Sequence, residues 1–424
     1  MVKDNSLVFL IHFNNWPLAF FMTGITVVYI FYVLLGFDPN TDTVVLHSGH
    51  ALLLVSLLLG LLQNKMDLLL PKYRIWFYLL LTYVFFLTIL GLINGNFSQN
   101  RYYFATDISS FAYFSGLLVA IERKNWRFVD SLLLYQFIIG TYLCIFAMLM
   151  YQVPLLYQYV IWTPLYNFWG LLYAAPYFLL TLSNRGTLIK LLIIIGVSIH
   201  FILVILALKR IFVGELFLLT VLYMYLKYRH GKYVSWRQIN IFKGVLGFIG
   251  LFLLAIIVIQ IGQYLSHSAE YGSGYGLSGL QHRFTRNEGL LITTSEDYRL
   301  KYEPATVLEQ LSGYSVIFGE GIGAVIPVSI LHSPTGSAGD LHNGLAKIFL
   351  KGGILFLILW LYIWFVFLKD CLNNRNERLI PNYIVVLVNV ILMIVKTVIV
   401  SFPSFGLFMF CAGYCMSRER EIEN

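Results

Sequence analysis

The chain has 424 residues, of which 59% are hydrophobic and 12% are charged, and its mean hydropathy is +0.76. Soluble domains are nearer half apolar and one-quarter charged, so this composition excludes an ordinary soluble protein and predicts a surface that faces lipid. The net charge of +8 is also found in proteins that bind nucleic acid. The topology described below accounts for that charge, and we expect no nucleic-acid partner.

Apolar runs long enough to cross a membrane follow one another along most of the chain. The hydrocarbon core is about 30 Å thick and a helix rises about 1.5 Å per residue, so a span needs about 20 apolar residues. We therefore expect an all-α, polytopic transmembrane bundle of about 12 helices. The expected spans are 16–36, 47–63, 73–93, 103–121, 128–150, 163–183, 188–208, 210–227, 242–266, 342–368, 383–401 and 403–417.

One long polar segment interrupts these runs. It divides the chain into residues 1–266, with transmembrane helices 1 to 9, an extracytoplasmic loop at 267–341, and residues 342–424, with helices 10 to 12 and a cytoplasmic tail. The loop contains a mixed segment, 286–316, in which we expect one or two short helices, followed by a glycine-rich stretch at 319–323. Loops of this length are usually functional or disordered.

The basic residues predict the orientation. With the N-terminus in the cytoplasm, most of the 29 Lys and Arg residues fall in links on the cytoplasmic side, such as 65–74 and 123–127. The short links on the opposite side hold only Arg101, Lys209 and Arg210. Because short cytoplasmic links carry an excess of Lys and Arg, both termini are expected in the cytoplasm. No small-residue cleavage site follows the first apolar run, so we expect that run to remain as an anchor.

The four cysteines predict no disulfide in the loop, because none of them lies in residues 267–341. Cys411 and Cys415 lie four residues apart in one apolar run. Since no other ligand residues cluster with them, we expect them to fill space as small apolar side chains.

Ionisable residues within the expected spans gather toward one face of the membrane. Such residues are costly in a bilayer and normally face a cavity or a partner, so they mark candidate functional sites. The predicted topology puts these in the outer half: His47, His50, Asp107, His200, Glu215, Lys347, Lys351 and Lys396. Each has a plainer interpretation, such as a packing histidine, a paired carboxylate, or a lysine that is paired or reaches the interface. Together they predict a cationic cavity that opens to the outside.

A cationic cavity at headgroup level suits an anionic group such as a diphosphate. Arginine offers a planar fork of donors that matches phosphate, and lysine adds a point charge. The outer side has no D-x-D motif and no His/Cys ligand cluster. We therefore expect Arg and Lys to hold the anion, with no metal and no cofactor.

Five short stretches carry a family resemblance. They are Leu-Ala-Leu-Lys-Arg at 206–210, Asp-Tyr-Arg-Leu at 297–300, Gly-Glu-Gly-Ile-Gly at 319–323, Leu-His-Asn at 341–343, and the glycine pair 352–353. In this order, with a long outer loop before the histidine, they resemble the O-antigen polymerase and O-antigen ligase superfamily of bacterial surface-polysaccharide assembly.

The chain departs from the family pattern at two places. Lys209 stands where the family has Ser or Thr before its first arginine. An Ile-Leu-Phe run at 354–356 stands where the family has a small or aromatic residue after the glycines. These departures leave the choice between polymerase and ligase open.

The resemblance implies a metal-independent glycosyltransferase in the bacterial inner membrane. Its donor would be a glycan on a polyprenyl diphosphate in the outer leaflet. The acceptor would be a glycan for a polymerase of O-antigen or capsule repeat units, our leading interpretation, or lipid A–core for a ligase. Membrane lipid, a chain-length regulator and a flippase are the implied partners.

The resemblance also assigns roles to residues. Arg210 and Arg299 would stabilise the departing diphosphate. His342 would act as the base, since an unperturbed imidazole has a pKa of about 6.5 and neighbouring cations would keep it neutral. Attack opposite the leaving group would invert the anomeric centre. The remaining substrate-binding candidates are Lys209, Lys347, Lys396, Arg286, Glu215 and Asn343.

Each catalytic role has an alternative. His342 could instead be a histidine at a helix start that bonds to the loop backbone, and Arg299 could form a loop salt bridge. Arg283 and Arg286 compete with Arg299 for the second arginine role. A different class, a flippase for lipid-linked glycans, would need polar residues through the full depth of the bundle and often two related halves. The polar residues here are one-sided, and no related halves are visible.

Overall fold

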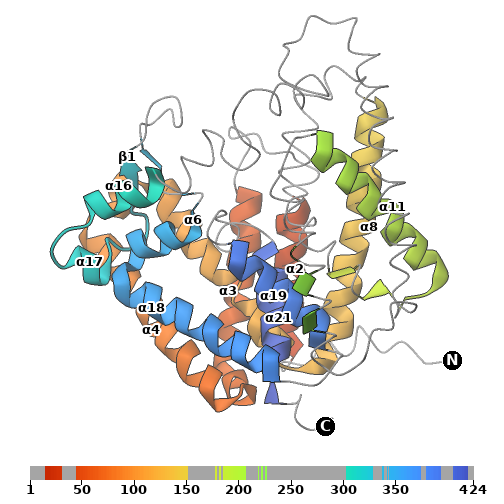
Figure 1. The fold of residues 1–424 in the computed structure, drawn as a ribbon, viewed down its shortest axis with the longest axis horizontal. Coiled ribbons are helices and arrows are strands. Elements are labelled where there is room, and N and C mark those ends of the chain that lie inside the picture. Colours follow the sequence, from red (N-terminus) through yellow and green to blue (C-terminus); the bar gives the residue numbers. More distant parts are fainter. Residues whose placement is uncertain are drawn as a thin grey trace, which may run out of the picture.

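The computed structural model describes residues 15–30, 44–150, 177–178, 181–182, 185–206, 218, 221–222, 225–226, 302–327, 337–338, 341, 343–373, 379–392 and 404–418. This part of the chain is predominantly helical (Figure 1). Its longer helices are α2 (Trp16–Ile30), α3 (Val44–Leu62), α4 (Pro71–Ile93), α6 (Arg101–Ala112), α8 (Trp126–Met150), α11 (Thr187–Leu206), α18 (Gly344–Asn373), α19 (Ile380–Leu392) and α21 (Ser404–Met416). Its shorter ones are η3 (Lys65–Leu68), α5 (Asn96–Gln99), α7 (Ser115–Ala120), η4 (Arg123–Asn125), α16 (Glu303–Gln310) and α17 (Ser315–Phe318).

The described helices follow the apolar runs of the sequence closely. The expected span 73–93 is α4, which begins with Pro71 in the first turn, where its missing N–H costs nothing. The expected span 103–121 is divided into α6 and α7, because the turn between them tightens: Phe114 N–H donates to the carbonyl of Phe111, three residues back. The expected spans 210–227 and 242–266 lie largely or wholly outside the described residues.

Some of these helices are apolar enough to cross a membrane. Within the described part, α4 and α18 have the length and composition of transmembrane spans. A third is added if 101–120 and 123–141, which meet at an angle of 106°, form one broken span. The sequence predicted about a dozen spans, and the described helices α2, α3, α11, α19 and α21 contribute apolar segments that are shorter than a full crossing.

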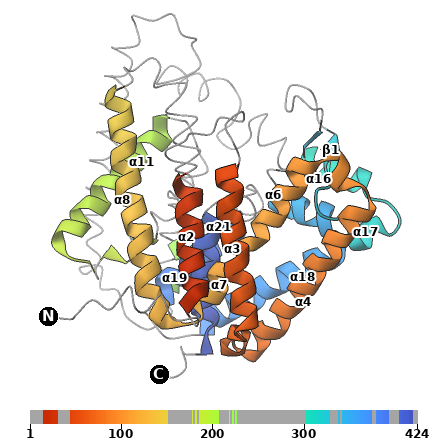
Figure 2. The ribbon, with the colours of Figure 1, turned by 180° about the vertical axis from the view of Figure 1, so that it is seen from behind.

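A central bundle of α2, α3, α7 and α21 is packed through small residues (Figures 1 and 2). A Cβ added to Gly24 would lie 2.9 Å from the carbonyl oxygen of Gly49, and one added to Gly413 would lie 2.3 Å from that of Leu117. Small residues allow helix backbones this close, which is how membrane helices gain packing contacts in lipid.

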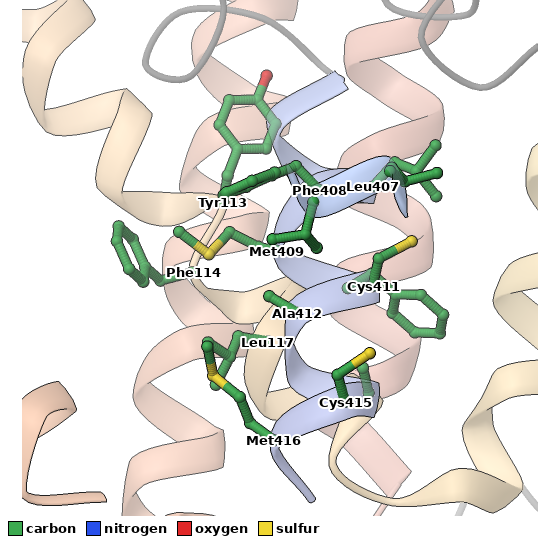
Figure 3. Packing of buried hydrophobic residues seen from close by; sticks show 14 of the residues in the cluster. Tyr113, Phe114, Leu117, Leu407, Phe408, Met409, Cys411, Ala412, Cys415 and Met416 are labelled. Atoms are coloured by element: carbon green, nitrogen blue, oxygen red, sulfur yellow. The ribbon is translucent and has the colours of Figure 1, made fainter. Parts of the chain in front are cut away.

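The core around α21 is apolar throughout (Figure 3). Cys411 and Cys415 form no disulfide and are fully buried there, as expected for small apolar side chains. Phe408 and Met409 face α6 and α7, where Tyr113, Phe114 and Leu117 complete the cluster.

Helices α4 and α18 lie side by side in both views (Figures 1 and 2). Trp76 Nε1 donates to the carbonyl of Leu359 at 3.1 Å, and the rings of Tyr83 and Phe356 stack with centroids 5.5 Å apart. These two helices therefore form one side of the described structure, and α18 contributes residues to the candidate site.

The links between helices contact one another in two separate sets. At one end, Lys65 pairs with Glu122 at 2.8 Å, Lys72 pairs with Asp370, and Leu69 bridges to Ser417. All of these lie in or next to links that the sequence assigns to the cytoplasmic side. At the other end, residues 94–96 contact 320–322, which the sequence assigns to the opposite side.

The segment 302–327 carries the short helices α16 and α17 and a strand. Strand β1 (Ile326–Pro327) pairs with β2 (Ser337–Ala338) in antiparallel register. The expectation of an all-α fold omitted this ribbon, because two residues per strand are too few to produce an alternating pattern in the sequence. Among the described residues, this two-stranded ribbon is the only β-sheet.

Candidate functional site

Only part of the predicted site lies in the described residues. Lys347 and Asn343 are described, near the start of α18. The three predicted catalytic residues, His342, Arg210 and Arg299, lie outside the described residues, as do Lys209, Lys396, Arg286 and Glu215. The described part of the candidate site is therefore the beginning of α18 and the elements packed against it.

A buried charge cluster joins α6 to α18. The Lys351 Nζ lies 2.6 Å from Oδ2 of Asp107, and the Lys347 Nζ lies 3.5 Å from Oδ1. The exposed fraction of each of the three side chains is 5% or less. Lys347 and Lys351 share one face of α18 because they are four residues apart. The sequence placed all three in the outer half of the membrane, and the structure brings them into one cluster.

The same cluster holds the glycine-rich segment 319–323. The Gly323 N–H donates to Asp107 Oδ2 at 2.9 Å, and Lys351 Nζ donates to the carbonyl of Ala324 at 2.6 Å. Both lysines contact one carboxylate, that of Asp107. Ionisable side chains buried within an expected span mark a candidate functional site.

A small cavity borders the cluster. Its volume is about 30 Å³, room for one or two water molecules but not for a sugar or a diphosphate. Asp107, Ser110, Lys347 and Lys351 are among the lining residues, but the surface of the cavity is almost entirely apolar. Apolar side chains line the rest: Leu87, Phe111, Phe114, Ile322, Ile348, Phe356 and Trp360.

A kink in α18 connects this cavity to the glycine-rich segment. Gly353 leaves the helical conformation, with φ 62° and ψ −168°. The carbonyls of Leu350 and Lys351 then accept hydrogen bonds from the N–H groups of Glu320 and Gly321, at 3.0 and 2.9 Å. Tyr83 on α4 donates to the carbonyl of Gly352. The interrupted helix therefore has its backbone groups bonded by a neighbouring segment, as a kink near the membrane requires.

The glycines of 319–323 are needed for this approach. Gly319, Gly321 and Gly323 have φ between 75° and 86°, a region that side-chain-bearing residues rarely adopt. A Cβ on Gly319 would lie 2.3 Å from the Lys351 carbonyl oxygen, and one on Gly321 would lie 2.3 Å from the Gly91 nitrogen. In the sequence these glycines are a feature of the long loop and part of the family resemblance, and the structure adds a packing role.

Asn343 caps α18. Its Oδ1 accepts from the Ala346 N–H at 3.0 Å, which satisfies one of the free donors at the helix start. Its own backbone N–H donates to Oε2 of Glu303 on α16 at 2.6 Å. The residue next to His342 in the chain is thus fixed from two sides. Glu303 is not among the residues predicted from the sequence, although a Glu-Pro pair is a common signal for a helix start.

His50 follows its plainer interpretation. Its Nε2 lies 3.1 Å from the hydroxyl of Tyr113, and the two rings meet edge to face. The side chain of His200 lies outside the described residues. His50 is therefore a packing histidine between α3 and the end of α6 in this structure.

The described ranges contain no group of three or more His, Cys, Asp or Glu side chains that could hold a metal ion. Fold and cluster together define a helical protein with membrane-compatible spans and a buried cluster of charged side chains near the start of α18. No family model, no curated protein and no solved structure matches the chain in the comparisons.

Proposed function

We propose that this protein is an inverting membrane glycosyltransferase. It transfers a glycan from a polyprenyl diphosphate to a sugar hydroxyl on the outer face of the bacterial inner membrane, with both of its termini in the cytoplasm. The leading form of the proposal is a polymerase of O-antigen or capsule repeat units. The ligase alternative uses the same donor and site with lipid A–core as acceptor.

The observation that supports the proposal is the buried lysine pair of α18. Lys347 and Lys351 lie one and a half to two and a half turns below His342 in the chain, and one carboxylate, Asp107, faces both. Their two ammonium groups supply positive charge near the start of α18, where the proposed diphosphate would develop negative charge.

The proposed chemistry uses each group once. The acceptor hydroxyl loses its proton to His342 as its oxygen attacks the anomeric carbon. The bond from that carbon to the phosphate oxygen breaks, and its electron pair leaves with the diphosphate. Arg210 and Arg299 hold the departing diphosphate, and the lysines of α18 add to the positive potential at the site.

The kink at Gly353 and the cap at Asn343 support this arrangement physically. Together they fix the first turns of α18, the element that follows His342 directly. A general base must be held within hydrogen-bond reach of the proton it removes. The described contacts supply such a rigid support on the C-terminal side of His342.

The test is an assay of purified protein in lipid with a polyprenyl-diphosphate glycan, read as product length on a gel. His342→Ala should abolish product and leave donor binding largely intact, because the base contacts the acceptor. Arg210→Ala should impair donor binding and turnover, and Arg210→Lys should rescue only part, since a point charge does not reproduce the bidentate fork. A chelator should have no effect.

Matched controls come from the predicted cytoplasmic side. His230→Ala changes the same residue type as His342→Ala, and Lys72→Ala removes a cation away from the proposed site. Both variants should leave product unchanged. Full activity in His342→Ala would overturn the mechanism. Activity that is lost with a chelator and returns with a divalent cation would overturn it as well.

A further inference from the structure

The segment that ends at the glycine-rich stretch exposes an apolar surface. None of the α17 residues is buried: Ile317 is 43% exposed, and Val316 and Phe318 are similar. Tyr314, which precedes the helix, is 83% exposed. Residues 311–319 contain no Asp, Glu, Lys, Arg or His. In water this cluster of exposed aromatic and aliphatic side chains would be unfavourable.

The segment lies well below the ends of the two candidate spans. Gly319 packs on the backbone of Lys351 and Gly352, eight residues into α18, and the Ile322 N–H bonds to the carbonyl of Leu87, six residues before the end of α4. At 1.5 Å per residue, these contacts are roughly 9 to 12 Å from the helix ends. The depth places α17 level with the apolar parts of both spans.

The exposed side chains of α17 continue the exposed apolar faces of its neighbours. The rings of Phe318 and Phe86 are 5.8 Å apart, which joins α17 to α4. Both ribbon views show α17 on the flank of the α4–α18 pair (Figures 1 and 2). The neighbouring exposed residues are Phe85, Phe86 and Ile89 on α4 and Ile354, Leu355 and Ile358 on α18.

The backbone of this segment is compatible with an apolar surrounding. The N–H groups of Ile317, Phe318 and Gly319 donate within the segment, to the carbonyls of Tyr314 and Ser315. The next three, from residues 320–322, donate to α18 and α4. Irregular backbone at membrane depth is tolerated where its polar groups are bonded to protein in this way.

We propose that residues 314–318 insert into the outer leaflet and contact lipid acyl chains as part of the lipid-facing surface. Tyr314, with an apolar ring and a polar hydroxyl, lies at the headgroup boundary. The segment thereby anchors the extracytoplasmic region to the bilayer beside the charge cluster. The proposal depends on α4 and α18 crossing the membrane, and it does not depend on the enzymatic activity.

The test uses an environment-sensitive fluorophore on cysteines introduced into the full chain in liposomes. Ile317→Cys and Val316→Cys probe α17, and Ile358→Cys is the lipid-facing standard on α18. Glu309→Cys, which replaces an exposed charged residue of α16, is the aqueous standard. The native cysteines 371, 411 and 415 are buried, so the parent chain treated with fluorophore serves as the blank. Fluorescence is measured only for variants that elute at the same volume as the parent chain. Two positions on α17 are probed, so that the test can still be made if one variant does not fold.

Probes at 316 and 317 should show blue-shifted emission and quenching by doxyl-labelled phospholipid comparable with those at 358, and little quenching by aqueous iodide. Iodide quenching like that at 309 would place α17 in water and overturn the proposal. Protection from both quenchers would mean that protein covers α17 and would overturn it too. A probe at 358 that lipid does not quench would remove the membrane premise, and the proposal with it.

Discussion

Lys351 on α18 and Asp107 on α6 form a buried ion pair in which Nζ lies 2.6 Å from Oδ2, and that same oxygen accepts the Gly323 N–H. One carboxylate oxygen thus joins two helices and the glycine-rich segment. Lys347 Nζ lies 3.5 Å from the other oxygen, so the cluster is a structural junction that lies within the candidate site.

The first prediction concerns the stability of this junction. Asp107→Asn removes the carboxylate that both buried lysines contact, and removing one partner of a buried pair costs about 3–5 kcal/mol. Lys351→Met should cost less, because Lys347 remains beside Asp107. We expect a lower thermal midpoint for Asp107→Asn in detergent or nanodiscs.

The control for that measurement is Lys72→Ala. It removes a pair with Asp370 in which the lysine is 44% exposed, and such pairs contribute about 0–1 kcal/mol. An Asp107→Asn midpoint no lower than that of Lys72→Ala would show that the buried cluster does not stabilise the fold.

The second prediction separates backbone strain from packing at the glycines. Gly313 and Gly319 both have positive φ, but a Cβ on Gly313 meets nothing within 4 Å, whereas one on Gly319 lies 2.3 Å from the Lys351 carbonyl oxygen. Gly313→Ala should cost roughly 1–2 kcal/mol from the left-handed backbone alone. Gly319→Ala should cost clearly more, read as thermal midpoints; equal losses would refute the close packing against the kink.

The third prediction concerns Asn343. Asn343→Ala should lower stability by about 1 kcal/mol through loss of the cap, and Asn343→Ser should restore it, because serine also caps. The predicted role in substrate binding requires that product formation stay low in Asn343→Ser, since the amide is still missing. Recovery of both stability and product would leave Asn343 with the capping role alone.

The fourth prediction concerns topology. Tyr275→Cys should react with a membrane-impermeant thiol reagent added from outside, and reporter fusions should place both termini in the cytoplasm, as the basic links indicate. The parent chain is the labelling control. Reaction of residue 275 only from the cytoplasmic side would reverse the orientation and remove the basis of the proposed site.

Helix positions were predictable because span length and apolarity are properties of local sequence. The expected runs 73–93 and 188–208 differ from α4 and α11 by two residues or fewer at each end. The partner of Asp107 was not predictable, since the sequence gives the depth of a charge and not the direction in which it faces. The kink at Gly353 was not predictable for a similar reason. Glycine is frequent in membrane helices, and the N–H groups that bond to the carbonyls at this kink come from another segment of the chain.

The glycine-rich junction also has a consequence for biogenesis. Asp107 and its hydrogen-bond donor Gly323 are 216 residues apart. At about 5–20 residues per second of synthesis, roughly 10–40 s separate their release from the ribosome, and Lys347 and Lys351 follow later still. During that interval α4, α6 and α7 reside in the nascent protein without α18 and α21. The N-terminal helices therefore depend on factors that shield incomplete helix bundles during insertion. Truncations late in the chain would leave Asp107 without its lysine partners, which quality control would detect.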